Sequence, residues 1–389
     1  MDIRKVSAEE WPAVQRIHSV VYNAPRTSFE VTERDAPAIE ATWGVFDDGV
    51  LVSVLTSHRF EMAYDGEYVK MAGIGGVGTL PEHRRRGHVR RLLEVAFASM
   101  HEREEAFSLL YPFSFPYYRM FGYELVYSQD RYLLPPGSMD VRARKGAMEQ
   151  VLEATPDVRT VYDGFARARN LAMRRGERHW ARHVHADPWK DQIFTYLYRD
   201  EAGTPRAYVT VRAEPSGPDA IRALVRDIGF DSGSALAALL PHLPSLFPRA
   251  TRFSLTLPSD VPLELLVAEP YDVEHRREAA MMGRVVDVRR AFEATRLPGS
   301  GEIVVGVADD QLDWNTGAWL VRWGEGEVRC EQTGRSPQLS TDIRVLAQLL
   351  LGYVDGATAL EFGLVESELS GAELGAIFPR KALYQNDHF

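Results

Sequence analysis

Residues 77–93 read VGTLPEHRRRGHVRRLL, and the rest of the chain is interpreted outward from this stretch. An apolar strand that contains glycine runs into a turn marked by Pro81, which is followed by three arginines and Gly87. Beyond this glycine, apolar residues recur at the spacing of one helix face, namely Val89, Leu92, Leu93, Ala96, Phe97 and Met100. The sequence therefore predicts that a basic loop connects a strand to the first turn of an amphipathic helix.

This loop has the composition of an anion-binding site. The first turn of a helix exposes unpaired backbone N–H groups at the positive end of the helix dipole, which favours phosphate. Gly87 would let the backbone approach a ligand, and the neighbouring arginines can hold a pyrophosphate through forked hydrogen bonds. The alternative is a solvated basic helix start, which is the more common meaning of an arginine run. We favour phosphate binding because the strand, the turn and the helix are all present.

The loop resembles motif A of the GNAT acetyltransferases, which is written [R/Q]-x-x-G-x-[G/A]. Arg84, Gly87 and Val89 occupy the marked positions, and Val89 departs from the pattern because the last position is usually glycine or alanine. The resemblance implies that this loop binds an acyl-CoA.

Composition bounds the class of protein. The chain has 389 residues, too many for one ordinary core, so two or three domains are expected. It has no apolar run of about 18 residues and no apolar signal core at its start, which predicts a cytoplasmic protein without a membrane span. The single cysteine, Cys330, excludes an internal disulfide framework and is expected in the core. The formal net charge of −10 argues against a dedicated nucleic-acid binder and is compatible with a cationic substrate.

The first 137 residues show the order of elements of a GNAT fold. A serine-capped helix is expected at 7–21, followed by hairpins around Asp48-Gly49 and Asp65-Gly66, a strand at 74–80 and the second helix. After a strand at 107–111 comes the segment Tyr118-x-x-Phe121-Gly122-Tyr123, which matches the short tyrosine-bearing helix that follows the splayed strands of GNAT folds.

Two further α/β units follow. The second repeats the order of the first, with strands expected at 193–199, 207–213, 221–228 and 252–257 and helices at 163–174, 180–184 and 234–240. Its loop at 229–233 reads GFDSG, with an acid and no arginine, so we interpret this unit as structural. The third unit begins near Met281, with strands expected at 301–307, 318–323 and 326–331 and helices at 289–294 and 341–351.

With these parts assembled, the chain resembles the Eis (enhanced intracellular survival) family of bacterial N-acetyltransferases over essentially its whole length. The resemblance rests on the basic loop, the Tyr118–Tyr123 segment, the sequence MGRVVDV at 282–288 and the final Phe389. It implies an α/β protein with two tandem GNAT domains, at 1–137 and 138–277, and a domain like sterol carrier protein 2 at 278–389. It also implies a homohexamer, acetyl-CoA as donor without a metal, and amine acceptors that include aminoglycosides and lysine side chains.

The resemblance assigns roles to individual residues. The strand residues Val77, Gly78 and Thr79 should meet the acetyl and pantetheine arm, and Phe113 and Ser114 should line the cofactor channel. The residues expected to cradle the pyrophosphate are Arg85, Arg86, Gly87, His88, Val89 and Arg90. Tyr118 matches the family's general acid, which protonates the departing thiolate, and the carboxylate of Phe389 matches its general base. An unperturbed chain-end carboxylate has a pKa of roughly 3.5 and tyrosine about 10, so the tyrosine suits a thiolate better than the carboxylate suits an ammonium.

Several alternatives stay open. Tyr118 could be a packed aromatic and Phe389 a frayed end. His179 and His183 lie four apart on an expected helix, a spacing that can hold zinc, but we favour surface histidines because Arg182 would repel a cation. Ala24 and His388 stand where family members can have acids, which makes aminoglycosides less secure acceptors than amines in general. The alternative function is a lipid or small-ligand carrier that binds acyl-CoA without turnover.

Overall fold

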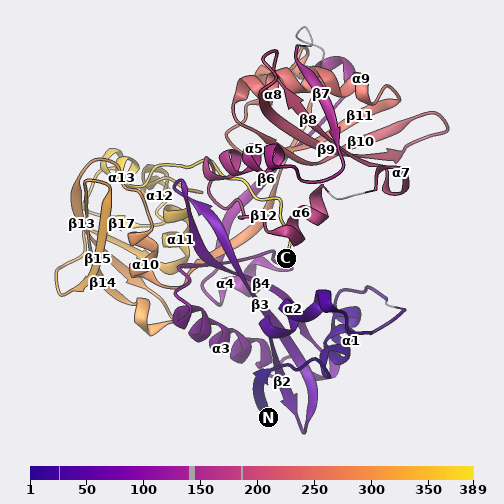
Figure 1. Ribbon diagram of the computed structural model, residues 1–389. Helices are drawn as coiled ribbons and strands as arrows, with labels where there is room; N and C mark the ends of the chain where they lie inside the picture. Colours follow the sequence, from indigo (N-terminus) through magenta and orange to yellow (C-terminus); the bar gives the residue numbers. More distant parts are fainter. Residues whose placement is uncertain (26, 140–144, 185–186) are drawn as a thin grey trace.

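The computed structural model describes residues 1–25, 27–139, 145–184 and 187–389 of the chain. Figure 1 shows three lobes: the N-terminal unit in indigo and violet, a second unit in magenta to red, and a third in orange and yellow. One sheet of twelve strands runs through the first two units in the order β1-β2-β3-β4-β5-β12-β6-β11-β10-β9-β8-β7, and a five-stranded sheet forms the third in the order β15-β14-β13-β16-β17. The α/β architecture predicted from the sequence is confirmed.

The first unit has the predicted order of helices and strands. Its elements are β1 (Asp2–Lys5), α1 (Trp11–Val21), the 3₁₀ turn η1 (Glu33–Asp35), α2 (Ala36–Ala41), β2 (Thr42–Asp47), β3 (Val50–Tyr64), β4 (Glu67–Thr79), η2 (Pro81–His83), α3 (His88–Glu102), β5 (Phe107–Leu110), α4 (Phe115–Arg119) and β6 (Glu124–Leu134). Both predicted hairpins form, but the expectation of separate strands was wrong, because the hairpins share the continuous strand β3, which pairs with β2 on one side and β4 on the other. No glycine or proline interrupts β3, so nothing ends the strand between the two expected halves.

The second unit continues the same sheet. Its elements are η3 (Pro136–Met139), β7 (Ala147–Val151), α5 (Pro156–Arg167), α6 (Glu177–His183), α7 (Pro188–Asp191), β8 (Ile193–Arg199), β9 (Pro205–Pro215), β10 (Ile221–Phe230), α8 (Gly233–Leu239), η4 (Leu240–His242), α9 (Leu243–Leu246), β11 (Ala250–Leu257), η5 (Leu263–Leu265) and η6 (Pro270–Asp272). The helix expected at 163–174 lies earlier, at α5, because Thr155 caps it through the Val158 N–H and Pro156 begins it.

The strand β12 (Glu274–Val285) connects the second unit to the third along the chain, and it lies in the sheet of the first unit, where it pairs with both β5 and β6. The expected limit between residues 277 and 278 therefore falls within one strand. Beyond β12 lie α10 (Val288–Glu293), β13 (Gly301–Ala308), η7 (Asp313–Asn315), β14 (Gly317–Gly324), β15 (Glu327–Thr333), β16 (Leu339–Asp342), α11 (Ile343–Leu351), α12 (Gly356–Glu361), β17 (Glu366–Ser367) and α13 (Gly371–Ile377). Cys330 is buried in this third core, as predicted.

Residues 378–389 form a tail without helix or strand that leaves the third unit and reaches the middle of the molecule, where Figure 1 marks the C-terminus close to α6 and to β3 and β4. Main-chain hydrogen bonds fix its course, from the Asn170 N–H to the Ala382 carbonyl and from the Tyr384 N–H to the Asn170 carbonyl. In the part of the chain that the structure describes, every helix is too short or too polar to cross a bilayer.

Candidate active site

The strands β4 and β5 separate at the centre of the first unit. Their parallel pairing ends where Ile74 meets Leu110, yet β4 continues to Thr79. A β-bulge in β4 lies beyond this point, and Gly76 there has a positive φ of 57°, which glycine adopts without strain. The splay expected for a GNAT fold is therefore present, and it leaves the edge of β4 toward β5 available for a ligand.

The cofactor residues predicted on β4 have their side chains engaged in packing. The Val77 side chain packs on the core, and the Val77 carbonyl accepts a hydrogen bond from the Tyr22 hydroxyl at 3.3 Å. A Cβ atom on Gly78 would lie 2.9 Å from Ile17. The hydroxyl of Thr79 lies 2.8 Å from that of Ser53. These residues can therefore offer a ligand mainly their backbone.

The start of α3 is open to an anion. Gly87 takes the N-cap position with a φ of 77°, no side chain caps the first turn, and a Cβ atom placed there would meet nothing within 4 Å. The N–H groups in the first turn of any helix, here including that of Arg90, have no intrahelical partner and lie at the positive end of the helix dipole. Because no side chain caps them here, they can bind an anion. Val89 packs on the core, so the larger side chain at this motif position points away from the loop.

Three arginines surround this helix start. Arg85 is exposed with a φ of 61°, and Arg86 lies 3.7 Å from Asp47 and donates to the Glu82 carbonyl. Arg90 donates to the side chain of Gln311 at 3.1 Å. They leave a cationic surface on which pyrophosphate fits. The His88 ring is buried without a hydrogen-bond partner among the described residues, so His88 can contribute only its backbone to this surface.

The corresponding helix of the second unit, α8, is closed to an anion. The Ser232 hydroxyl caps it by accepting a hydrogen bond from the Ala235 N–H at 3.2 Å. The carboxylate of Asp231 accepts a hydrogen bond from the same Ser232 hydroxyl at 2.8 Å and would repel phosphate. The start of α8 is therefore poorly suited to bind phosphate.

Tyr118 lies in α4, directly after the splay. The Ser114 hydroxyl caps this helix by accepting a hydrogen bond from the Tyr117 N–H at 3.4 Å, so it stabilises the start of the helix. The Tyr118 side chain is only 3% exposed, and the rings of Phe113 and Tyr117 each lie 5.4 Å from it. Burial, and then Tyr22 and Tyr123, raise the pKa of Tyr118 above its ordinary value, so the phenol is neutral near pH 7 and carries a proton that it can donate.

The end of the tail lies against β4. A Cβ atom on Gly73 would lie 2.7 Å from the Phe389 ring, and one on Gly75 would lie 3.1 Å from a main-chain carboxyl oxygen of Phe389. The Phe389 ring also packs on Phe60 and Tyr111, at centroid distances of 5.2 and 5.7 Å. The absence of side chains at Gly73 and Gly75 is thus what lets the tail reach the strand.

A buried clasp holds the tail in this position. The Asp387 carboxylate, 3% exposed, accepts hydrogen bonds from Arg175 at 3.1 Å and lies 2.9 Å from a ring nitrogen of His183. Arg175 also pairs with Asp227 at 2.6 Å. Burial alone would raise the pKa of Asp387, but Arg175 and His183 outweigh it and hold the pKa well below its usual range. The expectation that His183 is a surface histidine was wrong, because its ring meets the tail.

Tyr118 and Phe389 lie on opposite faces of the splayed strands. Side chains alternate along β4, so Gly73 and Gly75 face one side while Ile74 faces the other. Phe389 covers the first side, and Tyr118 shares its cluster with Ile74 on the second, where α3 also packs. A group that passes between β4 and β5 would therefore have the tail on one side and the tyrosine on the other.

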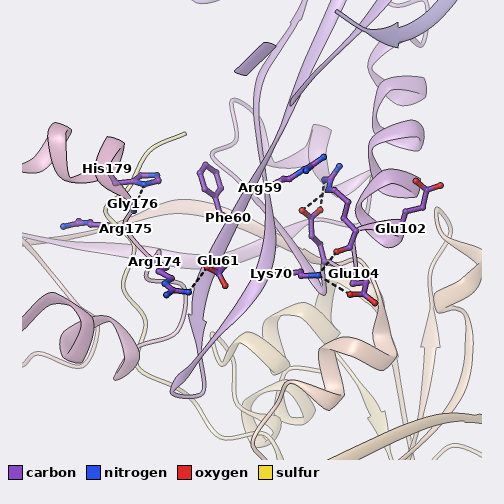
Figure 2. A pocket seen from close by; sticks show the side chains of 12 residues that line it. Arg59, Phe60, Glu61, Lys70, Glu102, Glu104, Arg174, Arg175, Gly176 and His179 are labelled. Carbon is purple, nitrogen blue, oxygen red and sulfur yellow. Dashed lines mark hydrogen bonds and ion pairs between the residues drawn. The ribbon is translucent and has the colours of Figure 1, made fainter. Parts of the chain in front are cut away.

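A cleft of about 750 Å³ opens beside the tail, between β3 and the segment before α6. Figure 2 shows His179 and Arg175 on one wall and Lys70 with Glu104 on the other. Phe60 stands between them, with its ring 5.7 Å from that of His179 and next to Phe389. The volume is that of a site for a small molecule, and it leads to the tail.

Comparison with known proteins identifies the units. The family described as "Acetyltransferase (GNAT) domain" matches residues 2–126, a second family of the same description matches 171–288, and "Sterol carrier protein domain" matches 288–385. Uncharacterized N-acetyltransferases of Streptomyces griseus and Streptomyces avermitilis are 28% and 26% identical to the chain, each over 96% of it and over 95% and 94% of their own lengths. This chain is a GNAT acetyltransferase.

Solved structures show the same three-domain fold. A GCN5-related N-acetyltransferase from Anabaena variabilis superposes with a TM-score of 0.90 at 22% identity, and Eis1 from Mycobacterium abscessus with 0.83 at 23%; each match covers 100% of both chains. The two GNAT domains and the sterol-carrier-like domain predicted from the sequence are confirmed.

Sequence reasoning missed the residues that place the tail of this acetyltransferase. Arg175, Asp227 and Asp387 come from three separate segments, and none belongs to a motif. Tyr111, whose hydroxyl donates to the Asp387 carbonyl at 3.3 Å, was missed as well. Only the His179-x-x-x-His183 spacing gave a signal, and it was interpreted as a surface feature.

Proposed function

We propose that this acetyltransferase transfers an acetyl group from acetyl-CoA directly to a primary amine. One observation carries the proposal: the splay between β4 and β5 has the open helix start of α3 on the side of Tyr118 and the Phe389 carboxyl group on the other. A thioester held by the basic loop would enter from the first side, and an amine would enter from the second. Both paths end at the same gap in the sheet.

Binding of the donor falls to the loop and the strand. Arg85, Arg86 and Arg90 would hold the pyrophosphate, together with the first-turn N–H groups at Gly87, His88 and Val89. Val77, Gly78 and Thr79 would hold the pantetheine arm through their backbone, with Phe113 and Ser114 at the channel edge. Phe113 is 71% exposed, so it can cover a ligand without unpacking the core.

The chemistry needs two proton transfers. The Phe389 carboxyl group would orient the ammonium and accept one of its protons, directly or through a water molecule. The neutral amine nitrogen then forms a bond to the acetyl carbon while the C–S bond breaks, and backbone N–H groups at the splay stabilise the oxyanion. Tyr118 gives its proton to the departing thiolate and regains one from the nitrogen through solvent, so that one proton is released per acetyl group transferred.

The resemblance to Eis proteins implies aminoglycosides or lysine side chains as acceptors and a homohexamer as the assembly, and we retain both as proposals. The carrier alternative has less support. The cavity that borders the third domain measures about 330 Å³ and is lined by charged residues that include Asp260, Arg277 and Lys381, which suits a lipid tail poorly.

Release of thiol from acetyl-CoA across a panel of primary amines tests the proposal. We expect turnover with at least one amine, and a fall in kcat of about 10²–10⁴-fold in Tyr118→Phe with little change in CoA affinity. Tyr117→Phe, one residue away in the same helix, is the matched control and should keep full turnover. Equal kcat in the two variants would remove Tyr118 from the mechanism, and no turnover with any amine would refute the proposed function.

A further inference from the structure

Two exposed arginines of α6 have no acidic partner among the described residues. Arg178 and Arg182 lie four residues apart on α6, so they project from one face of the helix. Arg182 Nη1 donates to the main-chain oxygen of His388 at 2.6 Å, one residue from the Phe389 carboxyl group. Arg178 donates to the carbonyl of Arg34 in η1. Both acceptors are neutral, and within the described ranges neither arginine forms an ion pair.

The arginines directly before α6 behave differently. Arg174 pairs with Glu61 at 3.0 Å, and Arg175 pairs with Asp227 and Asp387 in the buried clasp. The positive charges of Arg174 and Arg175 are thus matched within the protein. Those of Arg178 and Arg182 are exposed and remain available to a ligand.

The two arginines act on the space around the Phe389 carboxyl group. The ring of His58 lies 3.8 Å from the position that a Cβ atom on Gly75 would take, and the Phe389 carboxyl oxygen lies 3.1 Å from the same position. Burial, followed by Arg182 and Arg178, lowers the pKa of His58 to about 4. His58 is therefore neutral near pH 7, and the positive field beside the tail comes from the arginines.

Two positions where the family resemblance leads us to expect an acid do not carry one. Residue 24 is an exposed alanine, and the residue before Phe389 is His388. A polycation at this position would meet the exposed charges of Arg178 and Arg182, whereas the nearby carboxylates of Glu61 and Asp387 are already engaged by Arg174 and Arg175.

We propose that the acceptor is a small zwitterionic amine, such as a free amino acid, whose anionic group binds Arg178 and Arg182 while its ammonium lies at the Phe389 carboxyl group. This inference rests on the proposed acetyl transfer and specifies its substrate class. Guanidinium groups bind carboxylates through paired, charge-assisted hydrogen bonds, which would fix the amine in register with the thioester. Aminoglycosides, which carry several ammonium groups and no anion, fit this site poorly.

Matched pairs of amines test the inference by thiol release. Glycine and methylamine, β-alanine and ethylamine, and lysine and cadaverine each differ only by the carboxylate. In at least one pair we expect the kcat/KM of the amino acid to exceed that of the plain amine by about tenfold or more, and we expect aminoglycosides to be poorer than that amino acid. The Arg178→Gln/Arg182→Gln double variant should bring the ratio within that pair to about 1, and Arg182→Lys should retain part of it.

Arg249→Gln is the control, because Arg249, directly before β11, is also an exposed arginine that donates to backbone carbonyls, although it lies 3.6 Å from the Asp219 carboxylate as well. It should leave every ratio unchanged. The inference would be overturned if plain amines or aminoglycosides had the higher kcat/KM in all comparisons, or if the double variant still preferred the amino acid. Neither result would contradict acetyl transfer itself. Absence of thiol release with every amine would instead refute the proposed function, and the inference with it.

Discussion

Gly73→Ala should disable acetyl transfer without unfolding the protein. The added methyl carbon would lie 2.6 Å from the Phe60 ring and 2.7 and 2.8 Å from two atoms of the Phe389 ring. Ordinary carbon contacts are about 3.5–4.0 Å, so one or both rings must retreat by roughly 1 Å. Phe389 belongs to a tail without helix or strand, whereas Phe60 is held within β3, so the tail is the part that yields.

A displacement of this size is costly for catalysis. A misplacement of about 1 Å in a reacting group can reduce the rate about 10²-fold, and overpacking costs about 1–3 kcal/mol of stability. We therefore expect kcat in the thiol-release assay to fall about 100-fold and the melting temperature to fall by a few degrees. CoA affinity should be retained, because the basic loop lies on the other face of the strands.

Gly164→Ala is the matched control. A methyl group at this position in α5 meets nothing within 4 Å, and the substitution should leave turnover unchanged. Unchanged kcat in Gly73→Ala, with the substitution verified and the fold intact, would show that the position of Phe389 does not matter for the reaction.

Three further substitutions or treatments test separate parts of the account. Asp387→Asn keeps the shape of the clasp but loses a charge-assisted hydrogen bond worth about 1.5–3 kcal/mol, so carboxypeptidase should remove Phe389 about 10–100-fold faster; an unchanged rate would remove the clasp from the account. Arg85→Gln should raise the KM for acetyl-CoA roughly tenfold at nearly constant kcat, and an unchanged KM would place the pyrophosphate elsewhere. Burial raises the pKa of Cys330 to about 12, so alkylation of the native protein at pH 8 should be on the order of 10³-fold slower than that of a free thiol and become fast on unfolding; rapid native labelling would contradict its burial.

Most of the first unit could be predicted because local signals and the fold agree there. The Asp48-Gly49 and Asp65-Gly66 turns, the amphipathic spacing after Gly87 and the Tyr118 segment all formed close to where the pattern indicated. The strand β12 was missed because residues 274–279 are mostly charged and lack a strand pattern; pairing with β5 and β6 decides its structure. Local sequence patterns cannot predict pairing with strands that are distant in sequence.

The residues around the tail were beyond sequence reasoning for the same physical cause. Asp387 is 212 positions from Arg175, and its carboxylate is buried only because the third unit delivers it to the second. From the sequence, Asp387 is one more polar residue near a chain end, and His183 is one of a possible surface pair. Both residues hold the tail only because the fold brings three separate segments of the chain together.

The central claim is that the main-chain carboxylate of Phe389 takes part in the reaction as a charged group. Semisynthesis of the chain with a C-terminal carboxamide in place of this carboxylate changes the charge and preserves the phenylalanine ring, the tail and the clasp. The decisive measurement is kcat for acetyl transfer by the carboxamide protein, compared with the same semisynthetic chain ending in the acid, with CoA affinity measured in both. We predict a fall in kcat of about 10²-fold or more at equal CoA affinity. Equal kcat in the two proteins would contradict the account.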